Sequence, residues 1–305
     1  MPDAITAPQG FLSPAVQSLA REFGIDPRQI LGSGAGGRVT ARDVIAAARV
    51  QAAHEDAAHQ ENAGSANERS PAWSGDTTVE FSAIRKRTAA NLRASLDTAA
   101  HALVVTEVDY LAVERARQTA ATAGLALTYL PFVARAAIDS IVQFPEVNAV
   151  VHGDQLIIRR EINLGFAVDL DFKGLIVPVV HHADTLRLVT IAEAVQGLAD
   201  RARRRALTAD ELARGTFTIT NVGRYGTLMT GPIINQPQVA ILSSDGVKPR
   251  PVALPDGHGG HHIAVHPVGN LSLSFDHRAF DGAYASAFIA TVRDILESRD
   301  WEAEL

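Results

Sequence analysis

Residues 271–282 read LSLSFDHRAFDG, and their pattern decides how the C-terminal part of the chain folds. Up to Asp276, apolar residues alternate with serine or aspartate, which is the period-2 pattern of a half-buried strand. After Asp281 and Gly282, Asp281 can serve as a helix N-cap, and apolar residues recur on one helical face at Phe288, Val292, Ile295 and Leu296. The segment therefore predicts a strand, a turn that carries His277, and a helix.

A lone histidine after a strand is usually a surface residue or a satisfied core residue. Here, however, the run Asp276-His277-Arg278 with Asp281-Gly282 resembles the active-site motif of the dihydrolipoyl acyltransferases of 2-oxo acid dehydrogenase complexes. These enzymes are distantly related to chloramphenicol acetyltransferase. The resemblance extends from about residue 81 to the C-terminus. It implies an α/β fold with a chloramphenicol acetyltransferase-like two-layer catalytic domain.

Residues 11–49 form a separate small unit in the sequence, in which two short helical patterns flank a glycine-rich loop at residues 32–37. The loop fits the spacing G-x-G-x-x-G, but no strand precedes it and no βαβ unit surrounds it, so we reject a dinucleotide site. Residues 12–48 instead resemble the peripheral subunit-binding domain of the acyltransferase family. The resemblance implies a small helical domain that binds dehydrogenase or decarboxylase components.

Two arginines of the small unit, Arg21 and Arg38, match basic positions of that domain, and the resemblance implies that they bind partner subunits. In contrast, Gln17 and Ser18 stand where the family commonly has two basic residues. Loss of an arginine weakens a charge-dominated interface. The alternative that the small domain folds but is only an appendage, which binds no partner subunit, therefore stays open.

The composition limits the class of protein. With 305 residues and 47% hydrophobic residues, the chain can form one large domain or two unequal ones. The absence of cysteine excludes disulfides, thiolate catalysis and cysteine-bound zinc. A net charge of -6 gives no global basic field for nucleic-acid binding. No apolar run approaches the ~20 residues of a membrane span and the N-terminus lacks a signal-peptide pattern, so we expect a cytoplasmic protein without membrane partners.

Composition and periodicity divide the chain into three parts. Residues 50–77 cannot bury enough apolar surface to order themselves, so we predict a flexible linker between the small unit and a catalytic domain at 78–305. The periodicity of the large domain predicts helices at 84–96, 110–122, 131–144, 186–206 and 282–298. It predicts strands at 102–109, 155–160, 163–169, 175–180, 216–221, 239–243 and 263–275. Because these elements lack regular βαβ spacing, we expect one sheet covered by helices.

Acyl transfer needs a base for the attacking group and a donor that stabilises the tetrahedral oxyanion. The resemblance implies that His277 is the general base, a role typically worth ~10²- to 10⁴-fold in rate. Residues 215–223, GTFTITNVG, resemble a second motif of the family, in which a hydroxyl donates to the oxyanion, and Thr220 occupies that position. The alternative is that Thr218 and Thr220 merely alternate on the exposed side of a strand.

The remaining site residues have supporting places in the resemblance. Asp281 is expected to fix the loop that holds His277, and further support is expected from Asp276, Arg278, Gly282 and Asn221. In the family the histidine and the hydroxyl donor come from neighbouring subunits of a trimer. The resemblance therefore implies a homotrimer or a larger homo-oligomer.

We expect no bound metal and no permanently bound cofactor. Histidines can bind metal, but the histidines of the cluster lie in a glycine-rich loop without ligands at helical spacing; they are His258, His261, His262 and His266. Acetyl-CoA or another acyl-CoA is expected as a substrate. Only about ten residues precede the small unit, so we expect no lipoyl attachment site in this chain.

Three functions stay open. The hypothesis that we favour is a free-standing, acetyl-CoA-dependent acetyltransferase that acts on a hydroxyl or thiol of a small molecule in a natural-product pathway of the tetronate type. The second is a dihydrolipoyl acyltransferase core subunit of a 2-oxo acid dehydrogenase complex that uses a lipoyl domain supplied in trans. The third is an inactive scaffold. The expected lack of a lipoyl domain favours the first, and the intact motifs around His277 and Thr220 count against the third.

Overall fold

The structure is a computed structural model, which describes residues 16–17, 20, 26–30, 32–34, 38–47, 73 and 75–305. The chain divides into two compact units, Met1–Val79 and Glu80–Leu305. Arg21 and residues 50–72, the greater part of the predicted linker, lie outside the described residues. The predicted bounds of the three parts of the chain stay predictions.

The small unit is organised around the carboxylate of Asp43. Ser33 donates to it from its amide at 3.0 Å and from its hydroxyl at 2.7 Å, and Thr40 donates from its amide at 2.8 Å and from its hydroxyl at 2.9 Å. Thr40 directly precedes helical residues 41–47, so the bond from its amide to the Asp43 carboxylate is one half of a capping box. A 3₁₀ helix, η1 (Pro27–Gln29), precedes the loop, and Val16, Ala20 and Val44 are buried together.

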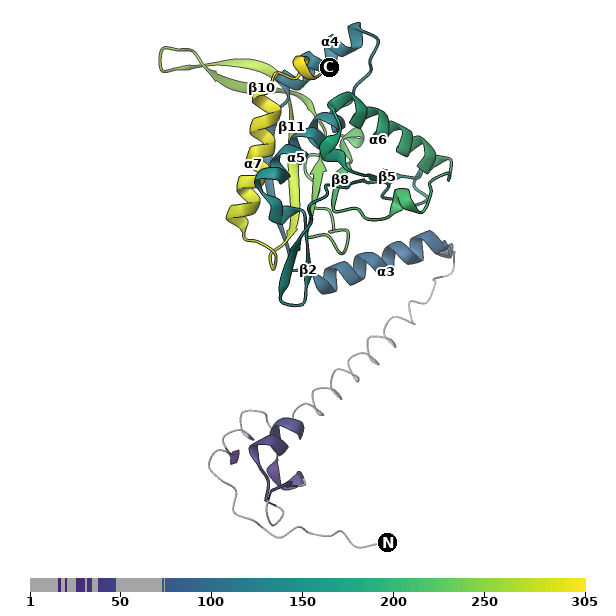
Figure 1. Cartoon of the computed structure of the whole chain (residues 1–305), viewed down its shortest axis with the longest axis vertical. Helices are drawn as coiled ribbons and strands as arrows, with labels where there is room; N and C mark the ends of the chain where they lie inside the picture. The colour runs from purple at the N-terminus through teal and green to yellow at the C-terminus, as the bar shows by residue number, and fades with distance from the viewer. Residues whose placement is uncertain are drawn as a thin grey trace. The chain divides into compact units, whose positions relative to one another are not determined.

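A seven-stranded sheet organises the larger unit (Figure 1). Six strands follow the order β1 (His101–Asp109), β11 (His261–Asp276), β9 (Ala240–Ser244), β8 (Phe217–Asn221), β4 (Leu164–Phe166) and β7 (Val179–Val180), and β10 (Lys248–Pro255) pairs with β11. The β4–β8 and β8–β9 pairs are parallel and the others are antiparallel. Two small hairpins lie outside this sheet: β2 (Ala149–His152) with β3 (Gln155–Ile158), and β5 (Val168–Asp169) with β6 (Leu175–Ile176).

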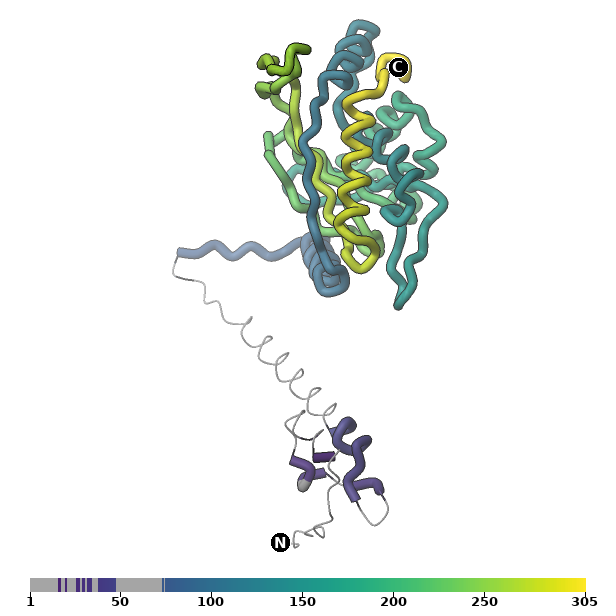
Figure 2. Tube along the Cα trace, turned by 90° about the vertical axis from the view of Figure 1, so that its left-hand side faces the viewer, coloured from purple at the N-terminus to yellow at the C-terminus, as the bar shows by residue number. Residues whose placement is uncertain are grey.

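Four helices cover one face of the sheet: α4 (Leu111–Thr122), α5 (Leu130–Gln143), α6 (Leu188–Arg203) and α7 (Gly282–Ser298). In Figure 1, α5, α6 and α7 lie in front of the strands, and Figure 2 shows α7 beside them from the side. The helices share one core with apolar strand residues such as Leu273, Phe275 and Leu242. This two-layer arrangement confirms the predicted α/β fold class.

The opposite face of the sheet, here called the outer face, carries the alternate residues of the same strands. On β11 these are Ser272, Ser274 and Asp276, all buried. Residues 227–234 cross this face, because Leu228 accepts a hydrogen bond from the Asn270 side chain at 2.7 Å, and Ile234 packs with Ala99 and Ile241. The polar outer face of β11 is therefore buried as well as the apolar face that packs on the helices.

Helix α3 (Ala83–Thr98) lies apart from the four-helix layer. Among its residues only Ser95 is buried, and its hydroxyl donates to the carbonyl of Ile234 at 2.6 Å. The 3₁₀ helices of the larger unit are η2 (Pro145–Val147), η3 (Ala183–Thr185), η4 (Asp210–Leu212), η5 (Gly223–Tyr225) and η6 (Glu302–Glu304). No helix among the described residues is both long enough and apolar enough to cross a bilayer.

The five predicted helices are confirmed, with ends shifted by at most three residues. The predicted strands 163–169 and 175–180 are each divided in two. β4 and β7 belong to the large sheet, whereas β5 and β6 pair with each other in a hairpin, whose turn gives Asp171 and Phe172 φ of 53° and 62°. Two strands were not predicted, β2 and β10. β10 contains three prolines, which argue against a central strand, and it is accommodated as an edge strand that pairs only with β11.

Candidate active site

The end of β11 is fixed by an ion pair between Asp276 and Arg278. Arg278 donates from Nε to both carboxylate oxygens at 3.0 and 3.1 Å and from a terminal nitrogen at 2.6 Å. The amides of Arg278 and Ala100 also donate to Asp276, at 3.0 and 3.2 Å. Burial alone would raise the pKa of Asp276, but these hydrogen bonds outweigh it and lower the pKa below its usual value. Asp276 is therefore a charged anchor that joins the end of β11 to residues just before β1.

His277 follows this anchor with its side chain half exposed. Its amide donates to the carbonyl of Ala100 at 2.9 Å, which holds its backbone, and its ring lies 5.6 Å from the Phe275 ring. Nδ1 lies 3.5 Å from Oδ1 of Asp281, too long for a good hydrogen bond but close enough for electrostatic attraction. The carboxylate thus favours a proton on Nδ1, which leaves Nε2 as the nitrogen with a free lone pair.

Asp281 occupies the N-cap position of α7, as the sequence predicts, and Gly282 is the first helical residue. The Asp281 side chain makes no capping hydrogen bond. Its carboxylate instead lies near the His277 ring, and its expected role of fixing the loop that holds His277 stays a prediction. The turn between His277 and Asp281 is held against the end of β11, because Phe280 stacks on Phe275 with the ring centroids 5.2 Å apart.

Thr220 and Asn221 are the last two residues of strand β8, which is separated from β11 by β9. Thr218 is fully buried and its hydroxyl donates to Gln238 Oε1 at 2.6 Å, so the two threonines do not simply alternate on an exposed side. Thr220 is half-buried, and the chain turns directly after it, where Asn221 Oδ1 accepts from the Gly223 amide at 2.9 Å. A Cβ at Gly223 would lie 2.7 Å from the carbonyl oxygen of Asp245, so glycine permits this close approach.

Within one chain the structure does not bring Thr220 and His277 together. Thr220 pairs with Ser243 in the sheet, and Ser243 pairs with Ser272. Ser272 lies four residues before the strand end at Asp276, which is roughly 13 Å at ~3.3 Å per residue, and two strand spacings add roughly 10 Å across the sheet. One acyl group cannot contact both side chains of the same chain.

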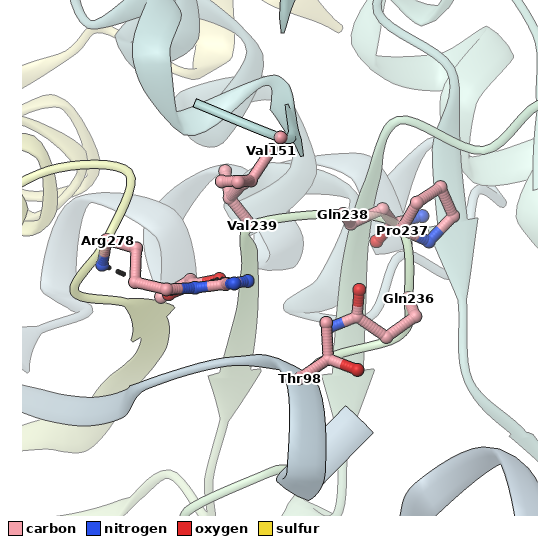
Figure 3. Close-up of a pocket in the computed structure, with 9 residues that line it drawn as sticks. Thr98, Val151, Gln236, Pro237, Gln238, Val239 and Arg278 are labelled. Atoms are coloured by element: carbon pink, nitrogen blue, oxygen red, sulfur yellow. Dashed lines mark hydrogen bonds and ion pairs between the residues drawn. The ribbon is translucent and has the colours of Figure 1, made fainter. Parts of the chain in front are cut away.

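A cavity of about 230 Å³ lies beside the Asp276–Arg278 pair. Figure 3 shows Arg278 on one side of it and Gln236, Pro237 and Gln238 on the other. The full lining comprises Thr98, Val151, Gly153, Gln236, Pro237, Gln238, Val239, Asp276 and Arg278. Sequence reasoning missed the segment 236–238, because it carries no periodic or charged signal and reaches the site only through folding.

The histidine cluster near β11 is not arranged as a metal site. Among the residues that the structure describes, no group of three or more His, Cys, Asp and Glu side chains could hold a metal ion. His258, His261 and His262 are exposed on the β10–β11 hairpin, whereas His266 Nδ1 pairs with the carboxylate of Asp109 at the end of β1.

Two family models match the chain. One describes the catalytic domain of 2-oxoacid dehydrogenase acyltransferases and matches residues 74–303, and the other describes an E3 binding domain and matches residues 10–45. The acetyltransferase component of the pyruvate dehydrogenase complex of Corynebacterium glutamicum is 36% identical, over 97% of this chain and 45% of that protein. The lipoamide acyltransferase component of the branched-chain alpha-keto acid dehydrogenase complex of Bacillus subtilis is also 36% identical, over 94% of this chain and 71% of that protein.

Solved structures give the same result for the larger unit. The cubic core of a pyruvate dehydrogenase multienzyme complex is 31% identical, with a TM-score of 0.67 over 73% of this chain and 92% of that one. The dihydrolipoamide acetyltransferase of Azotobacter vinelandii is 32% identical, with a TM-score of 0.67 over 72% and 91%. That enzyme was investigated for the roles of a serine, a histidine and an asparagine four residues after the histidine in its catalytic mechanism. This chain spans about half the length of the curated relative from Corynebacterium.

These comparisons correct the function that we favoured from the sequence. The prediction of a free-standing acetyltransferase of a natural-product pathway is wrong, because relatives that align with nearly the whole chain are components of 2-oxoacid dehydrogenase complexes. The similarity favours the second hypothesis instead. The sequence argument failed because it gave weight to what precedes the small unit, which says nothing about the chemistry of the larger one.

Proposed function

This chain belongs to the 2-oxoacid dehydrogenase acyltransferase family, and we propose that its larger unit transfers an acyl group between coenzyme A and a dihydrolipoyl group, as part of a 2-oxoacid dehydrogenase complex. The family match over residues 74–303 supports the reaction class. The single observation in the structure that carries the proposal is the half-exposed His277 ring at the end of β11, with Nδ1 3.5 Å from the Asp281 carboxylate.

In the proposed reaction His277 is the general base. Nε2 accepts the proton of the attacking thiol, and the sulfur forms a bond to the carbonyl carbon of the acyl thioester. When the tetrahedral intermediate collapses, the bond from carbon to the leaving sulfur breaks, and the leaving thiolate takes the proton back from Nε2. The acyl group changes sulfur and no net proton is consumed, so the same residues serve both directions.

Thr220 is the proposed donor to the oxyanion of the intermediate. Its hydroxyl is half-buried at the end of β8, next to the turn at Asn221. A donor in this role is typically worth on the order of 10²- to 10³-fold in rate. The serine investigated in the Azotobacter enzyme supports a hydroxyl in the mechanism, and the asparagine four residues after the histidine there corresponds in spacing to Asp281.

We propose that the site is completed by a second copy of the chain, in a homotrimer or a larger homo-oligomer. The separation of Thr220 from His277 within one chain supports this, because both must contact one acyl group. Assembly of a related chain into a cubic core supports a symmetric oligomer.

The small unit is proposed to bind another component of the complex. The E3 binding domain match over residues 10–45 supports this role, and Arg38 is exposed on the described part of that unit. Arg21 stays a prediction, because it lies outside the described residues.

The test is acyl transfer from acetyl-CoA to dihydrolipoamide by the full chain, followed by mass spectrometry. His277→Ala should lower the rate by at least ~10²-fold with the oligomer unchanged by light scattering, and His262→Ala, on the exposed hairpin, should behave as wild type. Product that does not depend on His277 would contradict the general-base role. A folded wild type without product would contradict acyl transfer and favour the scaffold.

A further inference from the structure

Two serine hydroxyls on the outer face of the sheet have no use in the mechanism above. Ser243 on β9 and Ser272 on β11 are both 0% exposed, and neither hydroxyl has a hydrogen-bond partner among the described residues. Buried hydroxyls in native proteins are nearly always hydrogen-bonded, so each exception requires an explanation.

The sheet register places these hydroxyls in one row with Thr220. Thr220 is directly opposite Ser243 in the parallel β8–β9 pair, and Ser243 is directly opposite Ser272 in the antiparallel β9–β11 pair. Residues that pair in this way point to the same face of a sheet, with Cβ atoms about 5 Å apart across antiparallel strands. The nearest polar side chains along the row are therefore the three hydroxyls themselves.

The row is closed to solvent at Ser272 and opens toward Thr220. Residues 227–231 lie across it, because the Gly246 amide donates to the Thr227 carbonyl at 3.0 Å and the Asn270 side chain donates to the Leu228 carbonyl at 2.7 Å. The buried carboxylate of Asp245 fixes the same segment, since it accepts hydrogen bonds from the hydroxyls of Thr227 and Thr230 at 2.8 and 2.7 Å. Thr220, in contrast, is only half-buried.

We propose that Ser243, backed by Ser272, is a positioning residue for Thr220. Its hydroxyl donates to Thr220 Oγ1 through one bridging water, so that the Thr220 proton is left to point at the oxyanion. A hydroxyl that accepts one hydrogen bond becomes a stronger donor in the next, and a rotor fixed before the reaction needs no reorganisation during it. The inference rests on the proposed acyl transfer and on Thr220 as the donor.

A purely structural role makes the opposite predictions. If Ser243 only fills space in the sheet, removal of its hydroxyl affects stability but not the rate constant of the chemical step. If it acts through Thr220, removal lowers kcat, leaves KM and the melting temperature unchanged, and has no further effect once Thr220 has lost its own hydroxyl.

The experiment is steady-state kinetics of the full chain with acetyl-CoA and dihydrolipoamide, together with thermal unfolding. Ser243→Ala should lower kcat about 10-fold, less than loss of the donor itself, and Ser243→Thr, which keeps a hydroxyl, should restore at least part of it. In a Thr220→Val background, Ser243→Ala should change kcat by less than about 2-fold. Ser274→Ala is the matched control, because Ser274 is buried on the same face of β11 but pairs with Ile241 and Leu103 instead of with the row.

Wild-type kcat in Ser243→Ala, or an equal loss in both backgrounds, would overturn the inference while the proposed function stands. Wild-type kcat in Thr220→Val would remove the assignment of Thr220 and the inference with it. An inactive, folded wild type would contradict the proposed function itself, so the failures are distinguishable.

Discussion

Asp276→Asn should destabilise the larger unit and misplace His277, although Asp276 has no proposed contact with substrate. The buried carboxylate accepts three hydrogen bonds from the Arg278 side chain and one from each of the Arg278 and Ala100 amides. An asparagine has one acceptor oxygen in place of two, so at least one amide or guanidinium donor loses its partner.

The expected loss follows from the burial of the two partners. Removal of one member of a fully buried ion pair costs about 3–5 kcal/mol, but the Arg278 side chain is 43% exposed and water can take over part of its hydrogen bonding. About 2–3 kcal/mol is therefore expected, which corresponds to a fall in Tm of roughly 4–12 °C for a unit of this size. Because the Asp276–Arg278 pair shapes the turn that carries His277, kcat should also fall by at least about 10-fold.

The assay is thermal unfolding at fixed protein concentration beside acyl transfer, with Asp281→Asn as the comparison. The Asp281 side chain is 86% exposed and lies 3.5 Å from His277 Nδ1, so its substitution should lower kcat with a change in stability below about 0.5 kcal/mol. An Asp276→Asn protein that melts within about 1 °C of wild type would refute the assignment of Asp276 as the anchor of the strand end.

Two further predictions concern parts of the chain away from the active site. Hydrogen bonds from the hydroxyl and amide of Ser33, and from Thr40, lower the pKa of Asp43. The Asp43 carboxylate therefore stabilises the small unit above the unfolded pKa of about 4, and this stabilisation is lost as the pH falls below that value. Asp43→Asn should remove this acid dependence, as measured by NMR of the small-unit amides, and an unchanged acid transition would contradict the prediction. Trp301→Ala should destabilise the larger unit by about 3–5 kcal/mol, because Trp301 is 1% exposed and packs edge-to-face on Phe132 with the ring centroids 5.2 Å apart. A denaturant midpoint equal to that of wild type would show that the C-terminal residues are not part of the core.

The order of helices and strands was predictable because the signals are local. The strand that ends at Asp276 and the helix from Gly282 follow from periods of 2.0 and 3.6 residues that survive without knowledge of the rest of the chain. The motif around His277 belongs to the same class of signal, since strand, turn and helix are contiguous. The exceptions, such as the proline-containing edge strand β10, are places where a partner strand overrides local preference.

The chemistry of the site depends on contacts that no local pattern contains. Asp276 accepts a hydrogen bond from the Ala100 amide, 176 residues earlier in the chain, and Thr218 donates one to Gln238, 20 residues later. The distance between Thr220 and His277 follows from the pairing of three strands. The sequence by itself therefore determined the order of the helices and strands and which residues are candidates for the site, whereas the tertiary structure decided which of these residues lie close together, because strand register is set by the packing of a whole sheet face and not by the residues of one strand.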